Sequence, residues 1–309
     1  MRTITEYIQT KNLRECRFYW AYMKRENINL PVEPVTASEY CIKINALINT
    51  FQGSLEQLES NIKTMKQAAT DSLLTNSELE WIDKGKERLC YWIWCYCRLA
   101  DIKKTIGWDG LIDINLDPNQ NLENNIYESL RLDKTPLTAK ERYDLIVKFI
   151  DIRNADLNKK RVLLNFWKEN WGYVYTTETF LWLDNKDPQQ CEWAYSYLAN
   201  SKEYQIPIWF IPTPTTSQQM YDATIAAFDI WPAHTDTKKM FIVKMKKAWS
   251  QKKHRDSQEG KKAYNVVMST DIKKKLDALA YNNGMKKNEF IEWLINQEAE
   301  LKVYSDSKK

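Results

Sequence analysis

The last part of the chain, residues 262–301, most constrains what this sequence can fold into. It begins with a short stretch in which apolar and polar residues alternate, the period of a β-strand with one buried face. Two stretches with apolar residues at helical spacing follow. Asn283-Gly284 separates them, because glycine tolerates the left-handed conformation that ends many helices. One strand and two helices of this size cannot enclose their own apolar faces, so the segment is predicted to share a core with a second copy.

The order of strand, helix, glycine turn and helix is the plan of a ribbon-helix-helix dimer. The strands of two copies would pair into an antiparallel ribbon with four helices beneath it, so dimerisation would be part of folding. Ser269 is placed to cap the first helix, and Asp271 in its first turn favours the helix dipole. The predicted dimer core consists of Tyr264, Val266, Met268, Ile272, Leu276, Leu279, Phe290, Ile291 and Leu294.

A two-stranded ribbon fits the major groove of duplex DNA, so the strand residues that alternate with the buried ones would point at base edges. These residues are Ala263, Asn265 and Val267. Asn265 can form a bidentate contact with adenine, whereas Val267 can only pack, for example on a thymine methyl group. Backbone N–H groups near Lys287 and Asn288, at the start of the second helix, would hold a phosphate. The structural alternative is a strand-helix-helix fragment inside a larger core.

Positive charge is concentrated just before this segment. Residues 237–262 hold ten Lys or Arg against two acidic residues, a net +8, whereas residues 1–236 carry a net −5. A basic stretch beside a predicted DNA-binding segment indicates contact with phosphates, although in isolation it would also suit a solvated helix face. The predicted phosphate-binding residues are Lys244, Lys247, Lys252, Lys253, His254, Arg255, Lys261 and Lys262.

The spacing of these residues resembles that of two known DNA-binding families. Tyr264, Asn265, Ala280, Asn283-Gly284 and Asn288 are spaced as in ribbon-helix-helix proteins of the Arc repressor type. A closer resemblance, over residues 187–301, is to the bacterial macrodomain Ter protein (MatP) family. It is carried by Leu276, Leu279, Ala280, Gly284, Glu289, Ile291 and Leu294-Ile295, by the basic run 252–255, and more weakly by Trp193, Tyr197-Leu198 and residues 218–222.

The MatP resemblance implies a dimer that binds a short palindromic DNA site, with a basic bundle segment on the flanking phosphates. It also implies a role in organising the chromosome around the replication terminus. Two departures limit what it implies. The chain stops at Lys309, which leaves little room for the coiled coil of that family, and residues 1–185 have no counterpart in it.

Upstream of this segment the chain is predicted to be mainly helical. Only 7 Gly and 9 Pro occur in 309 residues, and 13% of residues are aromatic, which suits helices around well-filled cores. A Ser or Thr followed three residues later by Glu or Gln marks a helix start, as does Asp187-Pro188. The marked starts are Thr36, Ser77, Thr138, Asp187 and Thr216, with the helix from Ser77 expected to continue to Leu99.

The predicted fold is thus a helical N-terminal region and a helical bundle, followed by the ribbon-helix-helix module. Its domains are residues 1–155, 156–257 and 258–309, with polar linkers expected at 115–125 and 257–260. Extended segments are expected at 172–175 and 206–212. Trp-Ala-Tyr occurs at 20–22 and 193–195, each before a Pro-bearing link and a capped helix, which indicates either a duplication or a chance likeness of two Trp-rich helices.

The six cysteines are predicted to be reduced core residues, with no metal and no cofactor. None forms a Cys-x-x-Cys pair, and Cys90, Trp94 and Cys97 would share one apolar helix face. No signal peptide and no membrane segment is expected, because no apolar stretch approaches the roughly 18 residues that a membrane span needs. A cytoplasmic protein associated with a bacterial nucleoid or plasmid is the expectation.

The leading functional hypothesis is a sequence-specific duplex DNA-binding protein that acts as a homodimer. The alternative is a transcriptional regulator, plasmid-partition protein or toxin-antitoxin or defence component in which residues 1–185 bind a protein partner. An enzyme is not expected, because the chain has no glycine-rich phosphate loop, no His-Glu-x-x-His and no serine elbow. The carboxylate pairs Glu78 with Glu80 and Asp151 with Asp156 are expected on solvated helix faces.

Overall fold

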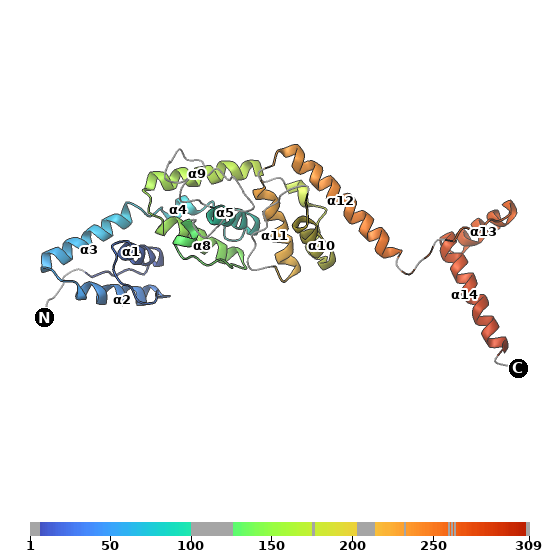
Figure 1. The fold of residues 1–309 in the computed structure, drawn as a ribbon, viewed down its shortest axis with the longest axis horizontal. Coiled ribbons are helices and arrows are strands. Elements are labelled where there is room, and N and C mark those ends of the chain that lie inside the picture. Colours follow the sequence, from blue (N-terminus) through green and yellow to red (C-terminus); the bar gives the residue numbers. More distant parts are fainter. Residues whose placement is uncertain are drawn as a thin grey trace. The chain divides into compact units, whose positions relative to one another are not determined.

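A computed structural model describes residues 7–99, 126–174, 177–202, 214–231, 233–258, 260, 262 and 264–306. In these ranges all regular secondary structure is helical and no β-strand is present, which confirms the mainly α class (Figure 1). The chain divides into two compact units, Met1–Lys252 and Lys253–Lys309. This division lies near the predicted boundary at 257/258. The predicted boundary at 155/156 lies between two helices whose residues share one apolar core.

The first unit consists of three similar groups of helices, which we call repeats A, B and C (Figure 1). Each repeat has a first helix, a long connection, a second helix and a third helix. The first helices are α1 (Leu13–Arg25), α5 (Glu87–Leu99) and α10 (Pro188–Ala199). The second are α2 (Ala37–Thr50), α8 (Ala139–Ile152) and α11 (Ser217–Ile230), and the third are α3 (Leu55–Thr70), α9 (Leu157–Val174) and α12 (Thr235–Ser257). Short elements lie between them: α4 (Asn76–Leu79), α7 (Ile126–Ser129) and the 3-10 helix η2 (Thr177–Phe180).

The second helices of the three repeats begin and end alike. Thr36, Thr138 and Thr216 are their N-caps, as predicted, and each accepts a hydrogen bond from the backbone N–H three residues later. Each helix then runs for 14 residues and ends at a C-cap in extended conformation, at Phe51, Arg153 and Trp231. Identical caps and lengths in all three repeats indicate an internal triplication. The Trp-Ala-Tyr likeness is not part of it, because the register that matches Cys16 with Cys191 matches Trp20 with Tyr195 and not with Trp193.

The first helices of repeats B and C follow the same turn. The Cys90 thiol donates to the carbonyl oxygen of Asp83 at 3.3 Å, and the Cys191 thiol donates to that of Asp184 at 3.2 Å. The prediction of one helix from Ser77 to Leu99 is therefore wrong. Thr75, not Ser77, caps the short helix α4 together with Glu78, and the turn at Asp83 separates α4 from α5.

Neighbouring repeats are joined by one recurring ion pair, between the first helix of one repeat and the second helix of the next. Arg14 donates to both carboxylate oxygens of Asp151, at 2.7 and 2.8 Å. Arg88 donates in the same way to Asp229, at 2.7 and 2.8 Å. Asp151 is 1% exposed, so the expectation that it lies on a solvated face is wrong. The reason is tertiary, because the neighbouring repeat brings an arginine to it.

A lysine lies beside each of these ion pairs, the buried Lys160 and the half-buried Lys238. The Lys160 ammonium donates to the carbonyl oxygens of Ser72 at 2.8 Å and Asp151 at 3.1 Å. The Lys238 ammonium donates to those of Phe228 at 3.0 Å and Asp229 at 3.3 Å. Both lysines thus satisfy carbonyl groups at the ends of helices, where backbone acceptors lack partners. Burial lowers the pKa of each lysine to about 8, because desolvation disfavours the charged form.

The outer positions of the array lack the pairing residues. In repeat A, Asn49 stands where repeats B and C have Asp151 and Asp229, and it accepts a hydrogen bond from the Tyr7 hydroxyl at 3.2 Å. In repeat C, the exposed Gln189 stands where Arg14 and Arg88 stand in the other repeats. The arginine–aspartate pairs therefore belong to the A–B and B–C junctions alone among the described helices. Such altered outer positions are typical of stacked repeats.

The apolar cores follow the repeats. One cluster of buried residues, between Ile8 and Ala69, belongs to repeat A, and a larger one, between Leu74 and Met245, fills repeats B and C. Most of the large aromatic residues in the larger cluster are buried, and Trp92 and Trp167 are inaccessible to solvent. The aromatic residues of this unit thus serve mainly to fill cores.

The cysteines and one expected extended segment also lie in helices or cores. Cys90, Trp94 and Cys97 are all buried on α5, as predicted, and burial raises the pKa of the Cys90 thiol to about 12. Residues 172–174 were expected to be extended but form the end of α9, whose helical pattern continues through them. The expected linker at 115–125 and the expected extended segment at 206–212 lie outside the described residues.

The ion pair at the B–C junction predicts a large and specific loss of stability. Arg88→Met leaves the buried Asp229 carboxylate without its arginine, so we expect the free energy of unfolding to fall by about 3 kcal/mol in urea titrations. Arg161→Met, which breaks the more exposed Arg161–Glu78 pair, should cost less than about 1 kcal/mol. The double variant Arg88→Met/Asp229→Leu should recover part of the loss. Equal effects of Arg88→Met and Arg161→Met would contradict this account.

Candidate nucleic-acid interface

The second unit is a pair of helices joined by a glycine turn. α13 spans Thr270–Asn282 and α14 spans Lys287–Asp306. Gly284 has a φ of +63°, its N–H donates to Tyr281 at 3.0 Å, and the N–H of Met285 donates to Ala280 at 3.0 Å. These two bonds form a Schellman motif, which satisfies carbonyl groups at the helix end. The predicted helix stop at Asn283-Gly284 is confirmed.

The start of α13 differs in detail from the prediction. Ser269 is the N-cap residue, but its side chain makes no capping hydrogen bond to the helix backbone. Instead its hydroxyl donates to the Asp271 carboxylate at 2.5 Å. This hydrogen bond lowers the pKa of Asp271, which lies in the first turn where the helix dipole favours a negative charge.

The segment before α13 does not form the predicted strand within the single chain. Residues 264–269 have no regular secondary structure, and Tyr264, Val266 and Val267 are 79%, 68% and 101% exposed. The physical reason is that a strand is defined by hydrogen bonds to a neighbouring strand, and in the predicted fold this neighbour belongs to the other copy. Asn265 is exposed as well, whereas Ala263 and Lys261 lie outside the described residues.

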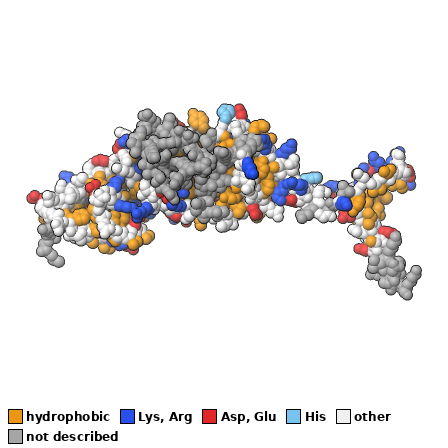
Figure 2. Space-filling model, viewed as in Figure 1, with side chains coloured by type: hydrophobic (Ala, Val, Ile, Leu, Met, Phe, Trp, Pro, Cys, Tyr) orange, Lys and Arg blue, Asp and Glu red, His pale blue; other side chains and the backbone are white. Residues whose placement is uncertain are grey.

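The second unit has only a fragment of an apolar core. Of its described residues, Ala280 and Phe290 are buried, and the Phe290 ring stacks on Trp293 with centroids 5.6 Å apart. The other residues expected in a dimer core remain accessible: Ile272 at 44%, Leu279 at 48%, Leu294 at 44% and Met268 at 40%, with Leu276 and Ile291 half-buried. Exposed apolar side chains on both helices can be seen in Figure 2. A cluster of this kind marks an interaction surface.

The basic stretch lies on the long helix α12. Phe241, Ile242, Met245 and Trp249 form its buried face. Several basic residues occupy its other face: Lys246, Lys247, Lys253, His254 and Arg255 are exposed, and Lys244 and Lys252 are half-buried. Lys and Arg side chains gather along this helix in Figure 2. The core contacts of α12 therefore leave a row of positive charge facing solvent.

The predicted phosphate site at the start of α14 is partly occupied by the chain's own carboxylates. The Lys287 ammonium lies 2.5 Å from the Asp277 carboxylate. The Glu289 carboxylate accepts a hydrogen bond from the N–H of Lys286 at 3.2 Å. Asn288 is exposed. A phosphate that bound here would have to displace Glu289 from this N–H group.

One basic group was not singled out from the sequence. Lys273, Lys274 and Lys275 are exposed in the first half of α13, and the Lys275 ammonium lies 3.7 Å from the Asp271 carboxylate. Lys262, at the approach to this helix, is exposed too. The signal that could have identified the group is a run of three lysines one turn after a predicted helix start.

The described residues hold no cluster of three His, Cys, Asp or Glu side chains arranged to bind a metal ion. None of their helices has the length and hydropathy of a membrane-spanning segment. Comparison of the chain with protein-family models, with curated proteins and with solved structures finds no match.

Proposed function

We propose that this protein is a homodimer that binds specific duplex DNA sites through residues 253–309 and the basic end of α12. The observation that carries the proposal is the incomplete core of the second unit. Its helices leave apolar side chains such as Ile272, Leu279 and Leu294 exposed on one chain. A second copy of the same surface is the simplest apolar partner, because a two-fold interface places identical patches against each other.

In the proposed dimer the two copies form a ribbon-helix-helix arrangement. Residues 264–268 of two copies would pair as an antiparallel ribbon, with Asn265 and Val267 on the outer face toward the major groove. α13 and α14 then supply the four helices beneath it. The resemblance to the MatP family supports a palindromic site and a role in organising a chromosome region. Regulation of a nearby promoter remains the alternative role.

The basic surface of α12 supports contact with phosphates outside the ribbon. Lys252, Lys253 and Arg255 lie within the last two turns of the helix, close in sequence to the proposed ribbon. Contacts of this kind supply affinity without reading sequence, and each one displaces counterions from the DNA.

The proposed dimer predicts that a charge in its core will dissociate it. Leu294→Glu should convert a dimer into a monomer in sedimentation equilibrium at micromolar concentration, because an unpaired carboxylate would be buried between the copies. Leu181→Glu is the matched control, since Leu181 is 79% exposed in the first unit and should leave the dimer intact. A wild-type protein that is monomeric at these concentrations would refute the proposal.

The phosphate contacts predict a uniform reduction of DNA affinity. Replacing Lys252, Lys253 and Arg255 together by Gln should weaken binding to all duplexes and reduce the salt slope by about 0.9 for each phosphate that the protein no longer neutralises. The charge-matched control replaces three exposed lysines of the first unit by Gln: Lys63, Lys140 and Lys168. Fluorescence anisotropy at several salt concentrations measures both slopes. The same slope in both variants would show that the end of α12 does not contact DNA.

Replacing Asn265 should change the specificity of DNA binding and leave the general affinity for DNA nearly unchanged. Once a selection from random duplexes has identified the preferred site, Asn265→Ala should reduce discrimination at one base pair of each half-site by about 1–3 kcal/mol. Binding to unrelated DNA should change little. Asn296→Ala, on the exposed part of α14, serves as the control. Unchanged site preference in the Asn265 variant would rule out the proposed orientation of the ribbon.

A further inference from the structure

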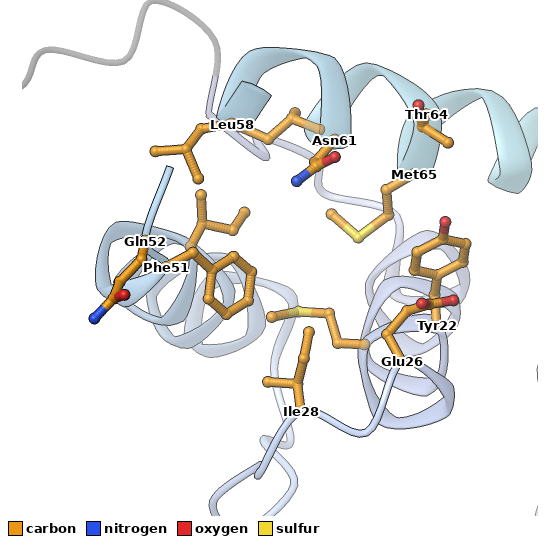
Figure 3. A pocket seen from close by; sticks show the side chains of 12 residues that line it. Tyr22, Glu26, Ile28, Phe51, Gln52, Leu58, Asn61, Thr64 and Met65 are labelled. Atoms are coloured by element: carbon orange, nitrogen blue, oxygen red, sulfur yellow. The ribbon is translucent and has the colours of Figure 1, made fainter. Parts of the chain in front are cut away.

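Repeat A contains an open apolar pocket that the proposed DNA-binding function does not use. Its volume is about 470 Å³, within the range of ligand pockets, and the ends of α1 and α2 and one side of α3 enclose it. Figure 3 shows side chains from the three helices around a common space, with Phe51, Leu58 and Met65 among them. Glu26 and Asn61 also line the pocket.

At one of the pocket-lining positions both other repeats bury a larger apolar side chain. Every third helix begins four residues after the C-cap of the second helix, so positions along the third helices can be matched directly. On this basis Asn61 of repeat A corresponds to Leu163 in repeat B and to Phe241 in repeat C, which are 3% and 1% exposed. Repeat A thus has a short polar side chain at a position where the others bury a large apolar one.

The residue at the position of Met65 also differs between repeats A and B. Its counterpart in repeat B is Trp167, whose indole is inaccessible to solvent, whereas repeat C has a methionine there too, Met245. The neighbouring Thr64 corresponds to Phe166, whose ring lies against Tyr96 with centroids 6.2 Å apart. The framework of three helices therefore accommodates an aromatic side chain at this place, and in repeat A no described side chain provides one.

The charge of the pocket lining indicates which charge a bound group should carry. Glu26 is the one charged residue among those that line the pocket, it is exposed, and no ion pair to it occurs among the described residues. Its neighbour Arg25 lies over the rings of Phe18 and Tyr22, at 5.5 and 5.8 Å. In repeat B the counterpart of Phe51 is Arg153, a buried cation beside the aromatic cluster. An occupant with an aromatic group and an adjacent positive charge complements both features.

We propose that this pocket binds an aromatic side chain, of the size of tryptophan, flanked by a basic residue in a segment of a partner protein. The aromatic ring enters the space between Phe51, Leu58 and Met65, and the cation pairs with Glu26 at the rim. Exposed residues such as Glu26 and Asn61 form its rim, so a polypeptide can lie across it. This gives the helical repeats a role as a protein-binding module, independent of whether residues 253–309 bind DNA.

The test uses the full chain with ¹³C-methyl-labelled methionine, because Met23 and Met65 line the pocket. The probes are the capped tripeptides Lys-Trp-Lys, Glu-Trp-Glu and Lys-Ala-Lys. We expect saturable shifts of both methyl signals with Lys-Trp-Lys, at least fivefold weaker binding of Glu-Trp-Glu, and no shift with Lys-Ala-Lys. Absence of any shift of these two signals at several millimolar Lys-Trp-Lys would overturn the proposal.

Variants separate the pocket from other sites. Asn61→Leu/Met65→Trp gives repeat A the residues of repeat B at these two positions. We expect it to weaken Lys-Trp-Lys binding at least tenfold, as measured from the shift of the Met23 methyl signal. The melting temperature should not fall. Thr64→Phe is a milder filling variant should the double variant fail to fold. Glu26→Gln should remove the preference for Lys-Trp-Lys over Glu-Trp-Glu. Undiminished binding to the filled variants, or equally tight binding of N-acetyltryptophanamide, would contradict a partner segment as the occupant.

Discussion

The bidentate pairing of an arginine with a buried aspartate at each junction between repeats is the interaction on which the first unit depends. Arg14 with Asp151 and Arg88 with Asp229 connect helices that lie far apart in the sequence. Burial raises the pKa of Asp229, and the charges of Arg88 and Lys238 oppose that rise. Buried ion pairs of this kind stabilise little in themselves because desolvation offsets their attraction, but a mismatched junction leaves a charge unpaired. We infer that the pairs set the order and register in which the repeats stack.

The two units differ in how they bury apolar surface. The repeats bury theirs within one chain, since each first helix packs on the second helix of its own repeat, and α1 and α5 also pack on that of the next repeat. The second unit is too small for this, and it buries only Ala280 and Phe290 among its described residues. Its remaining apolar side chains account for the proposed dimer. α12 has its apolar face in the core of repeat C and its basic face toward solvent.

Comparison of the repeats also shows where their side chains differ. The positions that face the core of each third helix hold Leu163 and Trp167 in repeat B but Asn61 and Met65 in repeat A. A smaller set of side chains on an unchanged framework leaves a cavity, because helices held by caps and junctions do not collapse to fill it. The pocket of repeat A follows from this difference. The same comparison indicates which kind of side chain the pocket accepts.

Local features of the structure could be derived from the sequence because they depend on neighbouring residues. Thr36, Thr138 and Thr216 cap their helices, Asn283-Gly284 ends α13, and the apolar face of α5 is buried, all as the pattern indicates. The junctions, the burial of Asp151 and the pocket could not be derived, because each depends on side chains brought together from distant repeats. The strand predicted at 264–268 could be derived only in part. Its alternating pattern is local, but its hydrogen-bond partners must come from another strand, and a single chain provides none among the residues described.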